Sequence, residues 1–240
     1  MRSAFCRRLF AVGVLPFFFF SNSTRRDPTE AESQAIAKVP GCTAFHVSNT
    51  SGKHLLITAR HCFGYQATNW CKTGEFKKID GETGKCLRLV AGDRQHDIAL
   101  FEAGFQNPAR ATYSLAAQPA AVGTRLQMIG YPADVYRKGA LTLTENCWVL
   151  KTGVQSPHSR KGIYDISSLH NCTTYGGNSG GPMIEEGTQV AIGLPFTYMP
   201  GDYTQRDPQN LQTSAHLAQM SDFVNTFRPT LVAEGVVIEE

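Results

Sequence analysis

The chain has 240 residues, of which 42% are hydrophobic and 18% are charged, and its formal net charge at pH 7 is +3. This length suits one or two domains with a real hydrophobic core. The balance of apolar and charged residues excludes a disordered chain and a bundle of membrane helices. No long basic run occurs, so the sequence gives no reason to expect nucleic acid as a partner.

Residues 1–23 are predicted to be a signal peptide. They begin with three arginines among the first eight residues, and an apolar run follows at residues 9–20. This run is too short to cross a bilayer comfortably, but it suits the apolar core of a secretory signal. We expect cleavage near residues 21–24, or a later cut at Arg25-Arg26, with no stable membrane insertion afterwards. An uncleaved membrane anchor is the alternative.

Six cysteines remain when the predicted signal peptide is removed, and they are Cys42, Cys62, Cys71, Cys86, Cys147 and Cys172. An even count in a secreted chain favours disulfide bonds, and six cysteines allow 15 pairings. Metal ligation is the competing interpretation, but the absence of any Cys-x-x-Cys spacing argues against zinc. We therefore expect an extracellular or periplasmic protein, without a metal or another cofactor.

Short β-rich runs make up most of the rest of the chain. Residues 24–40 are polar and then weakly helical, and they are interpreted as a propeptide remnant or an N-terminal arm. The next runs are 43–47, 55–58, 87–90 and 98–101. After a linker rich in small residues at 116–123, further runs follow at 125–129, 140–149, 162–167, 183–184 and 189–194. Many short strands at such spacing predict an all-β barrel or sandwich.

The chain is predicted to end in a helix. Residues 214–227 carry apolar side chains at offsets that fit one helical face. Residues 232–240 are expected to fray.

The stretch GGNSGGP, residues 176–182, places one serine among four glycines. A surface turn is one interpretation, because glycine is the usual turn residue. The other is a nucleophile, Ser179, beside bare backbone amides. A serine nucleophile needs a base to take its proton and a carboxylate to orient that base. His61 follows a strand-like run and Asp97 begins another, and the order His, Asp, Ser is that of chymotrypsin.

Three motifs make the sequence resemble the trypsin-like (chymotrypsin-fold) serine proteases. They are Thr58-Ala59-Arg60-His61-Cys62, Asp97-Ile98-Ala99-Leu100 and Gly177-Asn178-Ser179-Gly180-Gly181-Pro182. Weaker matches at Gly130-Tyr131-Pro132 and in the terminal helix extend the resemblance over residues 41–228. The sequence resembles the compact bacterial branches of the family, including the glutamyl endopeptidases, more than it resembles animal trypsins.

The resemblance implies two six-stranded antiparallel β-barrels, at residues 41–118 and 119–212, and a C-terminal helix and tail at 213–240. The active site would lie between the barrels. A Cys42–Cys62 bridge would pin the loop that carries the histidine. The remaining cysteines are assigned, as a guess, to Cys71–Cys86 and Cys147–Cys172.

The resemblance also implies a role for each site residue. His61 would take the proton of Ser179 and return it to the leaving amine, and Asp97 would stabilise the imidazolium. The amides of Gly177 and Ser179 would form the oxyanion hole. Asn178 stands where cleavage-activated trypsins have an aspartate, so trypsin-type activation is not implied.

The expected substrate-binding residues are Thr173, Thr174, Leu194, Pro195 and Phe196. Trypsins place an aspartate six residues before the serine, and Thr173 at this position predicts no preference for arginine or lysine. Glutamyl endopeptidases also carry threonine where Thr174 stands, but they add a histidine on the later strand that this chain lacks. Pro195 lacks a backbone donor for substrate. A small or medium uncharged side chain is the expected preference.

The sequence therefore predicts a secreted, monomeric serine endopeptidase that cleaves polypeptide substrates through an acyl-enzyme intermediate. Two alternatives remain open. A catalytically weak or inactive protease-fold binding protein is favoured by the unusual strand at residues 193–196. An esterase of the α/β-hydrolase type is disfavoured, because the Gly-x-Ser-x-Gly elbow is missing and the triad order differs.

Overall fold

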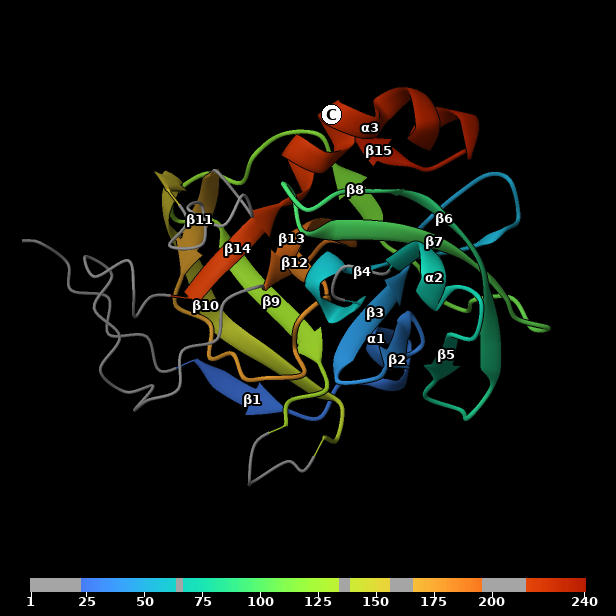
Figure 1. The fold of residues 1–240 in the computed structure, drawn as a ribbon. Helices are drawn as coiled ribbons and strands as arrows, with labels where there is room; N and C mark the ends of the chain where they lie inside the picture. The colour runs from blue at the N-terminus through green and yellow to red at the C-terminus, as the bar shows by residue number, and fades with distance from the viewer. Residues whose placement is uncertain (1–22, 64–66, 134–138, 156–165, 196–214) are drawn as a thin grey trace, which may run out of the picture.

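The computed structural model describes residues 23–63, 67–133, 139–155, 166–195 and 215–240. These residues form two closed six-stranded antiparallel β-barrels and one longer C-terminal helix (Figure 1). The predicted all-β, chymotrypsin-like architecture is thereby confirmed, and the α/β-hydrolase alternative is wrong. Residues 1–22 of the predicted signal peptide and Phe196 lie outside the described residues.

The first barrel is a ring with the strand order β2-β3-β4-β7-β6-β5. Its strands are β2 (Ile36–Val39), β3 (Cys42–His46), β4 (His54–Ala59), β5 (Glu75–Lys78), β6 (Thr83–Gly92) and β7 (Ile98–Gly104). Because β2 pairs with both β3 and β5, it closes the ring. The barrel thus begins inside the segment 24–40, ahead of the boundary expected from the sequence.

The second barrel is a ring with the order β9-β10-β11-β14-β13-β12, closed because β12 pairs with both β9 and β13. Its strands are β9 (Arg125–Gly130), β10 (Thr142–Gln155), β11 (Ile166–His170), β12 (Met183–Glu185), β13 (Val190–Pro195) and β14 (Ala215–Gln219). Two short strands, β8 (Ser114–Ala116) and β15 (Ile238–Glu239), extend this sheet beyond β13. The strand β1 (Thr24–Arg26) pairs with β10.

A hydrophobic core joins the two barrels. Along β4, Leu56 lies in the interior of the first barrel, whereas its neighbours Leu55 and Ile57 join a core that also contains Ile129 and Leu143 of the second barrel. Successive side chains of a strand point to opposite faces, so β4 contributes to both cores and is apolar throughout. This shared core holds the ends of the strands, and therefore the loops after them, in fixed relative positions.

The C-terminal helix begins later than the sequence predicted. Residues 215–219 form β14 and pair with β11 and β13, and α3 extends over Met220–Ala233. Leu217 fits the helical pattern of the residues that follow it, but it is fully buried in the second barrel. Pairing with two neighbouring strands therefore overrides the local periodicity.

Three shorter helical turns complete the described secondary structure: α1 (Glu30–Ser33), the 3-10 turn η1 (Arg60–Phe63) and α2 (Ala67–Trp70). The three disulfide bonds Cys42–Cys62, Cys71–Cys86 and Cys147–Cys172 confirm the predicted pairing. Such bonds persist in oxidising compartments and indicate an extracellular or periplasmic location. In the described part of the chain, no helix has the length and apolar character needed to span a membrane.

Candidate active site

His61 and Asp97 form a close hydrogen-bonded pair in the first barrel. His61 lies in the η1 turn directly after β4, and Asp97 directly precedes β7, the strand that pairs with β4. His61 Nδ1 lies 2.6 Å from Asp97 Oδ2, and the His61 backbone N–H donates to Oδ1, also at 2.6 Å. The carboxylate therefore holds both the backbone and the ring of the histidine. With Nδ1 donating, the neutral imidazole carries its lone pair on Nε2.

Asp97 is itself held in an uncommon backbone conformation. Its φ is 54°, in the left-handed region that few residues other than glycine adopt. The backbone N–H of Arg60 donates to its carbonyl oxygen at 2.8 Å. The Asp97 side chain is 2% exposed and that of His61 is 37% exposed. A buried acid thus orients a partly accessible imidazole, and backbone strain of this kind is typical of functional sites.

The pKa of His61 lies above its ordinary value of 6.5. Burial by itself would lower this pKa, but the hydrogen bond to Asp97 and the negative charge of that carboxylate outweigh burial. The site thus favours the imidazolium, which is the form a catalytic base reaches when it accepts a proton.

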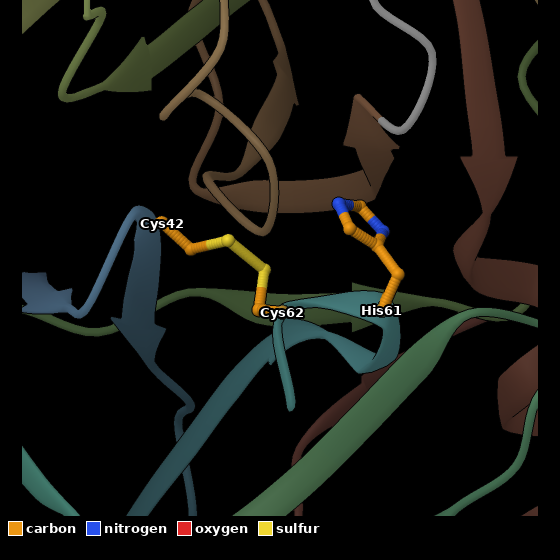
Figure 2. A group of neighbouring side chains, drawn as sticks. All are labelled: Cys42, His61 and Cys62. Atoms are coloured by element: carbon orange, nitrogen blue, oxygen red, sulfur yellow. A yellow bond between two sulfur atoms is a disulfide. The ribbon is translucent and has the colours of Figure 1, made fainter. Parts of the chain in front are cut away.

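The Cys42–Cys62 disulfide lies beside His61. Figure 2 shows the disulfide and the imidazole projecting on the same side of the η1 turn. The ligand atoms of these three residues lie within 4.8 Å of one another. Both sulfurs are consumed by the disulfide bond, and a metal needs thiolates, so the oxidised group offers only the imidazole as a ligand. The bridge instead ties η1 to the start of β3.

Ser179 lies on a loop of the second barrel that packs against β3 and the end of β4 of the first barrel. Its carbonyl oxygen accepts the backbone N–H of Thr43 on β3 at 2.9 Å. A Cβ on Gly180 would come within 2.3 Å of Thr58 Oγ1 and 2.5 Å of Ala59 N at the end of β4. His61 is only two residues further along the chain than Ala59. Two independent backbone contacts therefore bring the loop of Ser179 to the turn that carries the histidine.

The loop around Ser179 has its carbonyl groups fixed one by one. The oxygen of residue 176 accepts Ala133 N–H at 2.7 Å, that of residue 177 accepts the Thr43 hydroxyl at 2.8 Å, and that of residue 178 accepts Gly181 N–H at 2.9 Å. Because a peptide is planar and trans, each fixed carbonyl also fixes the direction of the next N–H. The amides of residues 177 and 179 therefore have set directions.

Three of the four glycines of this loop, Gly177, Gly180 and Gly181, are sterically required, so it is not an ordinary surface turn. Gly177 has φ +91°, and a Cβ there would lie 2.2 Å from the carbonyl oxygen of Tyr131. The weaker sequence match at Gly130-Tyr131-Pro132 thus marks the wall against which the loop packs. Asn178 is 3% exposed. Its amide is neutral and cannot form the buried ion pair of cleavage-activated trypsins.

The expected substrate-binding residues are distributed over two parts of the second barrel. Thr173 is half-buried and Thr174 is buried, and both lie on the loop that leads to Ser179. Leu194 and Pro195 are buried at the end of β13, where they pair with β14. The strand β14 separates β13 from β11, after which the loop begins. Phe196 is not among the described residues.

Sequence reasoning missed Thr43, whose hydroxyl bridges the two barrels. It accepts the Tyr131 N–H at 3.0 Å and donates to the carbonyl oxygen of Gly177 at 2.8 Å. The backbone carbonyl oxygen of Thr43 accepts a hydrogen bond from the Thr58 hydroxyl at 2.7 Å. The position next to Cys42 was its only signal in the sequence, because its partners come from distant strands.

The sequence model of one family, described as the trypsin-like peptidase domain, matches residues 42–194. No curated protein matches the chain. Among solved structures, the fold is similar to Rv3671c from M. tuberculosis H37Rv, as an inactive serine-to-alanine mutant, with TM-score 0.58, 15% identity, and coverage of 85% of this chain and 90% of that one. A second structure of the Rv3671c protease, also an inactive form, has TM-score 0.57 and 16% identity, covering 88% and 98%. At these identities the likeness shows the fold alone.

Proposed function

The chain belongs to the trypsin-like peptidase domain family, a family of proteases, and we propose that it is a secreted serine endopeptidase with Ser179 as its nucleophile. The observation that carries this proposal is the buried Asp97 carboxylate, hydrogen-bonded at 2.6 Å to the ring of His61 in the turn that directly follows β4, because the Ser179 loop packs against the end of that strand. A carboxylate in this position has a role in serine catalysis, because it sets the tautomer of the base.

In the proposed reaction, His61 Nε2 takes the proton of Ser179 as the serine oxygen attacks the substrate carbonyl. Asp97 stabilises the imidazolium that forms, and it does not itself take the proton. The imidazolium then protonates the leaving amine, which departs and leaves an acyl-enzyme. Water then attacks the ester as His61 removes its proton, and the imidazolium returns a proton to the serine oxygen as the carboxylic acid product leaves.

The oxyanion of each tetrahedral intermediate would be bound by the amides of Gly177 and Ser179. Support comes from the fixed peptide orientations: the carbonyl groups of residues 176 and 178 are both engaged, so neither peptide rotates without breaking a hydrogen bond. Donors that are oriented before the reaction stabilise developing charge without reorganisation at the moment of reaction.

Polypeptides are the substrates of the family. We propose a small or medium uncharged residue before the scissile bond, because Thr173 and Thr174 on the loop offer hydroxyls rather than a carboxylate. The three disulfide bonds support export to an oxidising compartment. A monomeric enzyme without cofactor remains our expectation.

A fluorophosphonate probe tests the nucleophile directly, because it forms a covalent bond only with an activated serine. We expect rapid labelling of the wild type and none of Ser179→Ala or His61→Ala. Ser51→Ala is the matched control, since this exposed serine lies in a turn of the first barrel. A folded wild type that stays unlabelled would contradict the proposal.

The second candidate is a protease-fold binding protein with little or no turnover. It is favoured by Pro195, which ends β13 and has no N–H to offer an extended substrate. Incubation with a peptide library separates the two: the endopeptidase yields fragments and a cleavage pattern, whereas a binding protein retains intact peptides.

A further inference from the structure

The strand β1 lies in line with β11 along one edge of β10. Both strands are antiparallel to β10: β11 ends with His170 opposite Val149, and β1 starts with Thr24 opposite Glu145. The other edge of β10 is occupied by β9. After β11 ends, the chain leaves the sheet to form the loop of Ser179, and β1 occupies the edge that β11 vacates. Figure 1 shows β1 beside β10, far from the C-terminal helix.

This placement brings the first described residues into contact with the Ser179 loop. The hydroxyl oxygens of Ser23 and Thr173 share a hydrogen bond at 2.5 Å. The guanidinium of Arg25 lies over the ring of Tyr175, with its carbon 4.9 Å from the ring centre. We call Ser23 to Arg26 the β1 segment. Its side chains contact two alternate residues of the loop, as expected for a strand with one face toward a neighbour.

The β1 segment is firmly held by Arg26. Its guanidinium binds both carboxylate oxygens of Glu32 at 2.8 and 2.9 Å, and its Nε donates to Glu145 on β10 at 3.2 Å. Glu32 also accepts from the backbone N–H of Thr29 at the start of α1. A bidentate arginine pair is geometrically specific. The segment is thereby fixed both to the second barrel and to the chain that enters the first.

The contact with Tyr175 leads directly to the nucleophile. The Tyr175 carbonyl oxygen accepts the N–H of Asn178 at 3.1 Å and so closes the turn that directly precedes Ser179. The Cys147–Cys172 bridge anchors the loop at its start, and Thr43 anchors it at residues 177 and 179. Between these anchors, the β1 segment contacts Thr173 and Tyr175, and Ala133 binds the carbonyl oxygen of residue 176.

We propose that Ser23 and Arg25 are positioning residues that hold residues 173–175, and through them the oxyanion-forming turn, in the catalytic arrangement. The proposal rests on the proposed function for its effect on turnover. It also requires the active protein to retain the β1 segment, so the signal is removed before Ser23 and the Arg25-Arg26 bond is not a processing site. The intact mass of the active secreted protein tests this point, and an active form that begins at Arg26 or later would overturn the proposal.

The main experiment compares single substitutions in the full chain. Arg25→Ala is expected to lower kcat/KM and the rate of probe labelling by the same factor, about two- to fivefold, the size of an exposed cation–π contact. Arg25→Lys keeps a cation over the ring and is expected to restore most of both rates. Thr24→Val is the matched control: Thr24 accepts a hydrogen bond from Asn146 on β10 at 2.8 Å, so its loss weakens the strand without touching the loop.

The pH profile separates positioning from damage to the base. Arg25→Ala should leave the acidic limb of kcat/KM unchanged, because His61 and Asp97 belong to the first barrel. A fall in rate that Thr24→Val reproduces, or that Arg25→Lys does not relieve, would mean that the segment only stabilises the fold.

Hydrogen exchange provides a readout that needs no activity. In a Ser179→Ala background, Arg25→Ala and Ser23→Ala are expected to accelerate amide exchange in residues 173–181 selectively, with Thr24→Val as control. An unlabelled wild type with this exchange pattern would refute the proposed function and leave the positioning role intact. Unchanged exchange, or a rise in activity on substitution, would overturn the positioning role.

Discussion

The two barrels hold their parts of the candidate site by different means. In the first barrel, one buried carboxylate holds both the backbone and the ring of His61, so the position of the base depends on a single charged side chain. In the second barrel, successive backbone carbonyl groups of the Ser179 loop each accept a hydrogen bond. The donors are different residues. The base should therefore be sensitive to one substitution and to pH. The loop should be sensitive to steric changes and should tolerate the loss of any single hydrogen bond better.

The largest effect is expected for Asp97→Asn. The amide keeps the shape of the carboxylate but favours the wrong tautomer of His61, so turnover should fall by about 10⁴-fold. Steady-state kinetics measures the loss, and circular dichroism checks that the barrels remain folded. If turnover fell by less than tenfold, the first barrel would not depend on this one carboxylate.

The second effect concerns the backbone of the loop. Gly177→Ala introduces a Cβ only 2.2 Å from the Tyr131 carbonyl oxygen at a positive φ, so the peptide must shift and the proposed oxyanion donor is lost. We expect kcat to fall by about 10²–10³-fold. Gly123→Ala is the matched control, because Gly123 has φ +89° with nothing within 4 Å of a Cβ. It shares the backbone strain and should change only the melting temperature; equal kinetic losses in both variants would contradict the steric argument.

The third prediction uses pH to separate the barrels. The base must be neutral in the free enzyme, and the pKa of His61 is raised, so kcat/KM should fall about tenfold per pH unit below a midpoint that lies above 6.5. Removing the charge of Asp97 removes the cause of the rise, so the midpoint of Asp97→Asn should move to lower pH. Gly177→Ala should keep the wild-type midpoint. A common midpoint in all three proteins would show that a group other than His61 determines the acidic limb of the kcat/KM profile.

The smallest effect is expected for Thr43→Val, which removes the hydroxyl between the barrels and keeps the side-chain shape. Thr43 is fully buried, and the groups it serves, the Tyr131 N–H and the Gly177 carbonyl, would lose one partner each. Leaving buried polar groups unsatisfied should lower the free energy of unfolding by about 1–3 kcal/mol. Denaturant unfolding measures this, and we expect kcat to change only a few-fold, because the neighbouring carbonyl groups stay engaged. A loss of kcat as large as that of Gly177→Ala would show that one bond controls the loop.

The local chemistry of the site could be predicted well from the sequence. His61 with Asp97, the glycines beside Ser179 and the Cys42–Cys62 bridge were all expected, because each depends on residues within a short motif or on a resemblance carried by such motifs. The other two disulfide pairs were guessed from the cysteines that remained. The role of Thr43 was not expected. A threonine in a strand has no local feature that reveals which distant carbonyl its hydroxyl will meet.

Predictions failed where pairing between distant strands decides the structure. Residues 215–219 have the periodicity of a helix with the residues that follow, yet they form β14 because β11 and β13 flank them. The polar residues 24–26 have no apolar pattern, yet they form β1 because β10 has an open edge beside the loop. Local sequence patterns predict which side chains are buried, but they do not indicate which strand edges are free to pair.

The amino-acid sequence by itself determined the proposed reactive groups of this protein, since an imidazole, a carboxylate and a hydroxyl among glycines are covalent facts with known chemistry. Only the tertiary structure decided which surfaces hold these groups in place: the hydroxyl of Thr43 between the barrels, and Ser23 and Arg25 on the loop. The physical reason is that such contacts join residues 88 to 150 positions apart, and their partners are set by how the barrels close and pack.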